Sequence, residues 1–103
     1  MRTILVKHPL RTFGVVRTDG EAFQHTCGGR ERWALESLIG AGPKGCTPID
    51  NPAPRWSHYV WLLREAGIEI ETIHEPHAGN FPGSHARYVL RSKVARLPNE
   101  EVA

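Results

Sequence analysis

Apolar side chains between residues 53 and 66 recur every three or four positions, which is the spacing of an amphipathic helix. The pattern predicts a helix over residues 53–66 with one buried face. That face carries Trp56, Tyr59, Val60, Leu63 and Ala66. The opposite face is polar apart from one large aromatic residue, Trp61. Gly67 ends the helical pattern, as glycine commonly does at a helix C-terminus.

The period of the pattern then changes from about 3.6 to two, which indicates a helix followed by a β-hairpin. Isoleucine and glutamate alternate over residues 68–71, and a similar alternation covers residues 87–91. Both segments are predicted to be half-buried strands, with Val94 closing the second one. Residues 75–85 contain two prolines and two glycines and are therefore predicted to form a loop.

The N-terminal part of the chain predicts two short strands and a helix. Apolar runs at residues 4–6 and 13–16 suit short strands. Residues 21–29 are predicted to be a connector, because two adjacent glycines interrupt any regular element there. Apolar residues at helical spacing predict a helix over residues 30–41, and the glycines and proline that follow end it.

A further helix start lies at Thr47, which can cap a helix, and at Pro48, which suits the first helical position. Asn51 and Pro52 repeat this start signal, so the helix between them is limited to about one turn. The predicted fold is therefore α+β. It has two N-terminal strands, three helices with a very short middle one, and a two-stranded hairpin.

The composition is that of one small globular domain, with 103 residues of which 40% are apolar. We divide the chain into N-terminal strands and connector (1–28), the main domain (29–94) and a polar tail (95–103). No apolar run approaches the roughly 20 residues of a membrane-spanning helix, and the first residues do not form a signal-peptide pattern. We therefore expect a cytoplasmic protein in which Cys27 and Cys46 are reduced thiols.

The net charge of +2 is too small to indicate a polyanionic partner by itself. The basic residues are nevertheless concentrated near the two ends of the chain. Residues 1–18 and residues 87–96 each contain four lysines or arginines and no acidic residue. A basic stripe results if these two segments lie side by side in the fold.

Several spaced motifs between residues 30 and 94 resemble those of helix-turn-helix and winged-helix proteins common in phages and prophages of bacteria. These motifs are Arg-x-Ser, Leu-Arg-x-x-Gly, Ile-x-Thr and Arg-Tyr-x-Leu, in that order. Their positions here are Arg55 and Ser57; Leu63, Arg64 and Gly67; Ile70 and Thr72; and Arg87, Tyr88 and Leu90. The chain departs from the pattern at Tyr59, where many relatives have a basic residue, and in its longer wing at residues 77–85.

The resemblance implies a DNA-binding protein, and more specifically a transcriptional regulator of phage or prophage type. The helix at 53–66 would enter the major groove of double-stranded DNA, with the hairpin as a wing on the adjacent backbone. The candidate contacts on the helix are Arg55, Ser57, His58, Trp61 and Arg64. The candidate contacts on the wing are His77, Asn80, Ser84, His85 and Arg87.

Two alternatives stay open. Trp61 is also suited to anchor a protein interface, because tryptophan is enriched there. The chain would then be a winged-helix interaction module, either an accessory subunit or an inhibitor of a host complex. In the wing, Glu69 and Glu71 have the parity to face the basic residues of the second strand, which would make those residues local ion-pair partners. A homodimer is a further option that the sequence leaves open.

We predict neither an enzyme nor a cofactor. Ser57 and His58 are sequence neighbours, as are Ser84 and His85, and neighbouring side chains on a helix or strand point in different directions. The chain lacks a phosphate-binding glycine loop and the paired cysteine spacing of a zinc site, so we also predict no metal.

Overall fold

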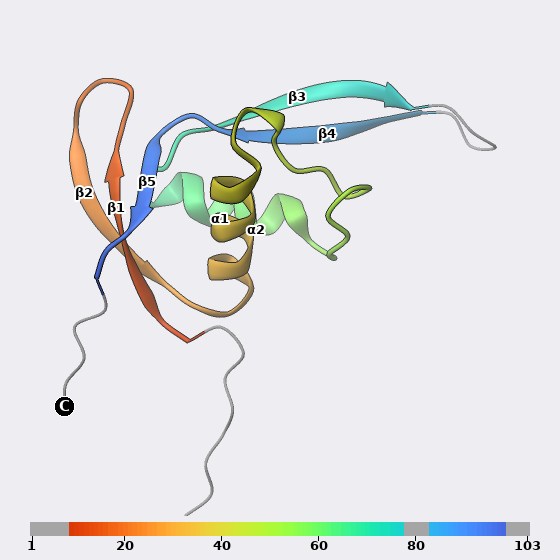
Figure 1. The fold of residues 1–103 in the computed structure, drawn as a ribbon. Coiled ribbons are helices and arrows are strands. Elements are labelled where there is room, and N and C mark those ends of the chain that lie inside the picture. Colours follow the sequence, from red (N-terminus) through yellow and green to blue (C-terminus); the bar gives the residue numbers. More distant parts are fainter. Residues whose placement is uncertain (1–8, 78–82, 99–103) are drawn as a thin grey trace, which may run out of the picture.

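The computed structural model describes residues 9–77 and 83–98, and the elements appear in Figure 1. The first half contains strands β1 (Arg11–Val16) and β2 (Ala22–Cys27), helix α1 (Gly29–Ala41) and a 3-10 turn, η1 (Gly42–Lys44). The second half contains helix α2 (Trp56–Glu65) and strands β3 (Ile70–His77), β4 (Gly83–Leu90) and β5 (Lys93–Arg96). The α+β prediction is confirmed, with strands at both ends of the described chain.

The strands form two antiparallel sheets on different sides of the helices (Figure 1). One sheet has the order β2-β1-β5, and the other is the β3-β4 hairpin. The hairpin lies along the helices and projects beyond them, as a wing does. Cys46 adds a single bridge to Tyr88, which ties the segment after η1 to the outer edge of β4.

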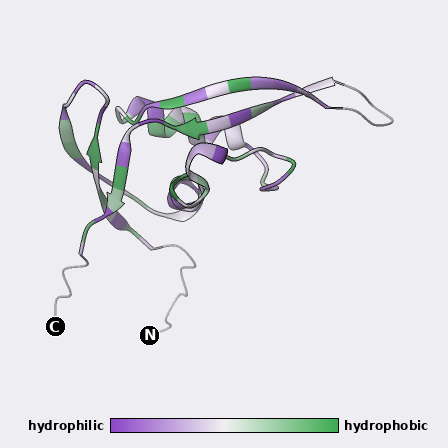
Figure 2. Ribbon diagram, turned by 45° about the horizontal axis from the view of Figure 1, so that its top comes forward, coloured by the Kyte–Doolittle hydropathy of each residue, from purple (hydrophilic) through white to green (hydrophobic). Residues whose placement is uncertain are grey.

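The core lies where the helices meet the strands, and apolar residues of both sheets contribute to it (Figure 2). The predicted buried face of α2 is confirmed for Trp56, Tyr59, Val60 and Leu63. The Trp56 ring also lies 5.9 Å from that of Tyr88, an arrangement that joins the start of α2 to the wing. Burial of large apolar side chains of this kind is the main stabilising contribution in a small domain.

Gly67 ends α2 as the sequence predicts. It has a φ of 101°, and its N–H donates to the carbonyl oxygen of Arg64 at 2.9 Å. The next residue, Ile68, donates to the carbonyl of Leu63 at 3.1 Å. These two bonds form a Schellman motif, which satisfies carbonyls that the helix end would leave unpaired.

The predicted short middle helix is wrong, because the described chain has only two α-helices. Residues 48–50 form a turn, closed by a bond from the Asn51 N–H to the Thr47 carbonyl oxygen at 2.8 Å. Pro52 follows directly and has no N–H with which to continue the helical bonding. It also disfavours helical backbone at the residue before it, so the first turn is not extended.

The predicted connector at residues 21–29 is also wrong, because most of it is the strand β2. Within this strand, Phe23, His25 and Cys27 turn inward, while the residues between them are exposed. This alternation was hidden in the sequence because His25 and the polar Gln24 and Thr26 break any apolar run. The strand predicted at residues 13–16 is confirmed within β1, and the one at residues 4–6 lies outside the described residues.

The wing strands are longer than predicted, since they reach His77 and begin again at Gly83. The predicted loop at residues 75–85 is therefore strand at both of its ends. Val94 does not close the second wing strand. It lies in a separate strand, β5, opposite Val15 of β1, and so joins the C-terminal part of the chain to the N-terminal sheet. Neither described helix is long and apolar enough to cross a membrane.

Candidate nucleic-acid interface

The outer face of α2 is a small exposed surface formed by Ser57, His58 and Trp61, which we call the helix face. Ser57 is exposed, and 55% of Trp61 is exposed in spite of its size. The imidazole of His58 stacks on the Trp61 indole, with ring centroids 6.3 Å apart and planes 14° apart. Residues three apart on a helix are neighbours, so the helix itself holds this stacked pair in place.

Arg55 lies directly before the helix face and has an unusual backbone. Its φ of 69° and ψ of 30° make it the only described residue other than glycine with a positive φ. Its carbonyl accepts bonds from the N–H groups of His58 and Tyr59, at 2.9 and 3.2 Å, which fixes this conformation at the start of α2. Left-handed backbone costs a residue with a Cβ atom about 1–2 kcal/mol, and such residues are often found at functional sites.

The guanidinium of Arg55 is exposed, and within the described chain it forms no hydrogen bond or ion pair. Lys44, Arg30 and Lys93 are likewise exposed bases without side-chain partners among the described residues. Of these four, Arg55 is the one that begins the helix face. Arg55 thus places a positive charge that has no partner among the described residues directly before the first turn of α2.

Arg64, the last predicted contact on α2, is exposed but donates hydrogen bonds to residues of β3. Its Nη2 donates to the carbonyl oxygen of Ile70 at 2.6 Å and to the Thr72 hydroxyl at 2.7 Å. Its Nε also donates to the Ile70 carbonyl, at 3.1 Å. Arg64 therefore joins the end of α2 to strand β3 and sets the angle between helix and wing. Thr72, the last residue of the Ile-x-Thr motif, is the acceptor that completes the contact.

Arg87 is similarly occupied on the wing. It donates two bonds to the carboxylate of Glu75, at 2.9 and 2.7 Å, and a third to the Lys44 carbonyl at 2.8 Å. Hydrogen bonding by Arg87, assisted by His85, lowers the pKa of Glu75 to about 2. The same contact with Glu75 raises the pKa of Arg87.

The predicted pairing of wing charges is only partly correct. Arg91 pairs with Glu71 as the parity suggested, whereas Arg87 pairs with Glu75, which lies further along β3. Glu69 instead accepts bonds from Thr18 and Ser92. The sequence did not show this because the exact register of β3 on β4 decides which carboxylate each arginine reaches.

The other predicted wing residues differ in whether their side chains already have partners within the chain. His85 bonds Glu75 through Nε2 at 2.9 Å, and its Nδ1 lies 3.0 Å from Nδ1 of His77, with one ring donating to the other. Ser84 is exposed at the start of β4. Asn80 lies outside the described residues. The structure thus brings His77, His85 and Arg87 into one chain of contacts through Glu75.

The two basic ends of the chain do lie side by side where the structure describes them, because β1 pairs with β5. Their charges are largely neutralised by nearby acids. Arg17 lies within 3.6 Å of Asp19, Glu21 and Glu69, and Arg96 pairs with Glu36. The expected basic stripe is therefore weaker than the sequence alone indicated.

Comparison with known proteins adds one finding. A family model described as a winged helix domain matches residues 24–100, which include the second part of β2, both helices, the wing and β5. No curated protein and no solved structure matches the chain.

Proposed function

The chain belongs to the winged helix domain family, and on that premise we propose that it binds double-stranded DNA through Arg55 and the helix face of α2. Membership of this family suggests DNA binding. The observation that carries the proposal is Arg55, an exposed cation that has no partner in the described part of the chain and is held in left-handed backbone at the start of the helix. In helices that read DNA, the residues at the N-terminal end meet the base edges in the major groove.

The geometry supports different roles for different residues of this interface. Arg55 can donate two bonds to a guanine or to a phosphate, and Ser57 can bond either one. The stacked pair of His58 and Trp61 offers an apolar surface further along α2. Arg64 and the contact between Arg87 and Glu75 position the wing instead, since both guanidinium groups already donate hydrogen bonds within the chain.

Binding to a fluorescent duplex, followed by anisotropy over a range of salt concentrations, tests the proposal. We expect Arg55→Ala to weaken binding by about 5- to 150-fold, which corresponds to about 1–3 kcal/mol for an arginine that contacts a base. Lys93→Ala is the matched control. It removes one exposed positive charge from β5, which belongs to the β2-β1-β5 sheet and not to the wing or α2. We expect this variant to weaken DNA binding much less. Failure to bind any duplex at low salt, or equal losses in the two variants, would contradict the proposal.

We further propose that the protein is a transcriptional regulator of phage or prophage type that works in the cytoplasm. The support for this is the set of motifs at Arg55, Ser57, Arg64 and Arg87 that resemble such proteins. We propose no catalytic step. A reporter gene under a cognate promoter, compared with and without the protein, tests the regulatory role; an unchanged reporter despite tight binding to its DNA would contradict it.

A second candidate function is protein binding through Trp61, as an accessory subunit or an inhibitor of a host complex. It is favoured by the 55% exposure of this tryptophan, which is high for so large an apolar side chain. Co-purification with a partner that is lost in Trp61→Ala and kept in Arg55→Ala would support protein binding. Loss of DNA binding in Arg55→Ala, with DNA binding kept in Trp61→Ala, would support the first proposal.

A further inference from the structure

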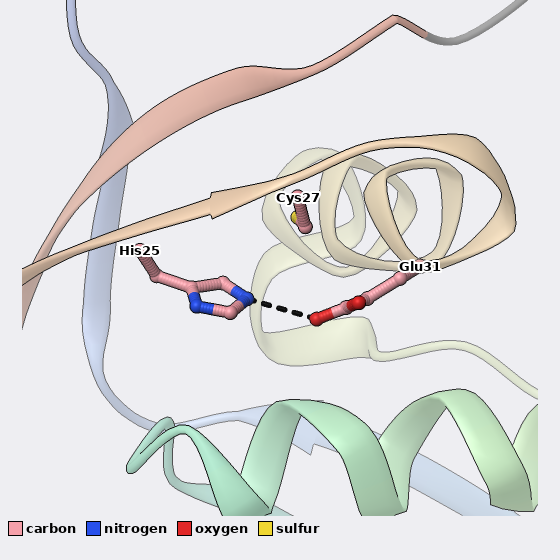
Figure 3. Close-up of side chains that lie close together, drawn as sticks. All are labelled: His25, Cys27 and Glu31. Carbon is pink, nitrogen blue, oxygen red and sulfur yellow. Dashed lines mark hydrogen bonds and ion pairs between the residues drawn. The ribbon is translucent and has the colours of Figure 1, made fainter.

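Three potential metal ligands meet where β2 leads into α1, at a distance in sequence from the residues of the helix face (Figure 3). One ligand atom from each of His25, Cys27 and Glu31 lies within 4.8 Å of the other two. His25 and Cys27 are two residues apart on β2 and so point to the same side of the strand. Glu31 reaches them from the first turn of α1.

The connection between the two elements creates this arrangement. Gly28 and Gly29 join them with almost no intervening chain, and Gly29 has a φ of 59°, which suits glycine. The chain therefore reverses within two residues, and the first helical turn lies beside the last residues of the strand. His25 Nε2 and Glu31 Oε2 are already 2.8 Å apart.

We propose that His25, Cys27 and Glu31 form a site for a divalent transition-metal ion of the zinc type. An imidazole nitrogen, a thiolate sulfur and a carboxylate oxygen are the three kinds of ligand that zinc takes in proteins. A thiolate and a carboxylate together balance the two positive charges of the ion, so the bound site is neutral. A neutral site suits this position, because Cys27 is only 3% exposed and unpaired charge would be costly there.

Binding requires His25 and Glu31 to move slightly apart and requires the Cys27 sulfur, which lies within 4.8 Å of both ligand atoms, to approach them by up to about 1 Å. Nitrogen and oxygen ligands on a tetrahedral zinc ion are about 3.3 Å apart, so His25 and Glu31 need to separate by about half an ångström. Their side chains are 18% and 22% exposed, which leaves one side of the site open to water as a fourth ligand. Binding displaces the thiol proton of Cys27 to solvent as the sulfur–metal bond forms.

The bound ion would fasten β2 to the start of α1 and thereby stabilise the domain that carries the helix face. Cobalt(II) is a suitable reporter, because it takes the same ligands as zinc and shows a thiolate-to-cobalt charge-transfer band. We expect the chelator-treated full chain to bind Co²⁺ in equimolar amount with this band, and Zn²⁺ to displace it. We also expect Zn²⁺ to raise the Tm, because a ligand that binds only the folded state stabilises it.

Two pairs of variants assign the site. Cys27→Ser should lose the band, and Glu31→Gln should weaken metal binding at least about tenfold. Cys46→Ser and Glu65→Gln are the controls, since these residues belong to no such ligand group among the described residues, and both should bind as the unmodified chain does. If Cys27→Ser does not fold, His25→Gln and Glu31→Gln at half-buried positions carry the test.

Absence of the band, loss of the band in Cys46→Ser, or unchanged affinity in Glu31→Gln would each overturn the metal site. None of these measurements involves DNA. A negative result would therefore leave the proposed function untouched, and failure of DNA binding would leave the metal site untouched.

Discussion

Arg87 and Glu75 form a two-bond ion pair across the wing, with Nε to Oε2 at 2.9 Å and Nη2 to Oε1 at 2.7 Å. The third bond of Arg87 reaches the carbonyl oxygen of Lys44 at 2.8 Å. One arginine thus joins both wing strands to the turn that follows α1. Bidentate pairs of this kind fix geometry as well as adding energy, so this contact orients the wing relative to the helices.

The first prediction concerns the pH dependence of that pair. Hydrogen bonds from Arg87 and then His85 lower the pKa of Glu75 from 4.5 to about 2. Because the folded-state pKa is the lower one, the stabilisation is complete above pH 4.5 and is lost as the pH falls towards 2. We expect Glu75→Gln to lower the free energy of unfolding, and this difference from the unmodified chain to shrink over that pH range. Urea unfolding at a series of pH values measures it.

Glu65→Gln is the control for this experiment, because Glu65 is exposed and forms no ion pair among the described residues. Its difference from the unmodified chain should stay small and nearly constant with pH. A Glu75→Gln difference that is independent of pH between 4.5 and 2 would show that the carboxylate is not stabilised in the folded protein.

The second prediction separates stability from DNA binding at Arg55. The backbone there has a φ of 69°, which glycine adopts without the steric cost that alanine and arginine share. We expect Arg55→Gly to be about 1 kcal/mol more stable than Arg55→Ala, while both variants bind DNA equally weakly. Urea unfolding and anisotropy on the same samples give the two quantities. Equal stability of the two variants would mean that the left-handed conformation is not kept in solution.

Glycine at position 45 leads to a third prediction, because the segment after η1 approaches β4 very closely. Gly45 has a φ of 72°, and a Cβ atom there would lie 2.5 Å from the Tyr88 carbonyl oxygen. That oxygen accepts the N–H of Cys46 at 2.9 Å, so it is not free to move. We expect Gly45→Ala to lower the free energy of unfolding by about 2–4 kcal/mol, from backbone strain and steric overlap together.

The matched control is Gly42→Ala, which has a similar φ of 58° and no atom within 4 Å of the added Cβ. It should lower the free energy of unfolding by only about 1–2 kcal/mol, because it adds backbone strain without steric overlap. Thermal unfolding of both variants compares them directly. Equal losses at the two positions would show that the approach of Gly45 to β4 does not matter.

Local patterns in the sequence were enough to predict the elements that build the helix face. The apolar spacing from Trp56 to Leu63 predicted α2 and its buried side, and Gly67 predicted where the helix ends. Both rest on contacts within a few residues of one another, which a periodic pattern records. The exposure of Trp61 followed from the same pattern, because it lies opposite the buried face.

Contacts between different secondary-structure elements could not be predicted from the sequence alone. The strand β2 has an inward-facing histidine rather than an apolar residue, so only its pairing with β1 identifies it. That histidine and Glu31 come together through the turn at Gly28 and Gly29, where the sequence predicts only an interruption of regular structure. The partner of Arg87 depends on strand register, which the motif itself does not encode.

The last prediction tests whether Arg64 supports the interface or touches DNA. Its guanidinium is bonded to the Ile70 carbonyl and to the Thr72 hydroxyl, so removal of the side chain should loosen α2 from β3. We expect Arg64→Ala to lower the free energy of unfolding by about 1–2 kcal/mol, in line with two or three lost hydrogen bonds. Thr72→Val removes one acceptor. The double variant should lose less free energy of unfolding than the sum of the two single variants, because both changes break the same contact.

An arginine that instead neutralises a phosphate would, on replacement, lower the salt dependence of DNA binding by about one unit of slope and leave stability unchanged. Urea unfolding of the four proteins, with anisotropy against salt for Arg64→Ala, therefore distinguishes a positioning residue from a DNA contact.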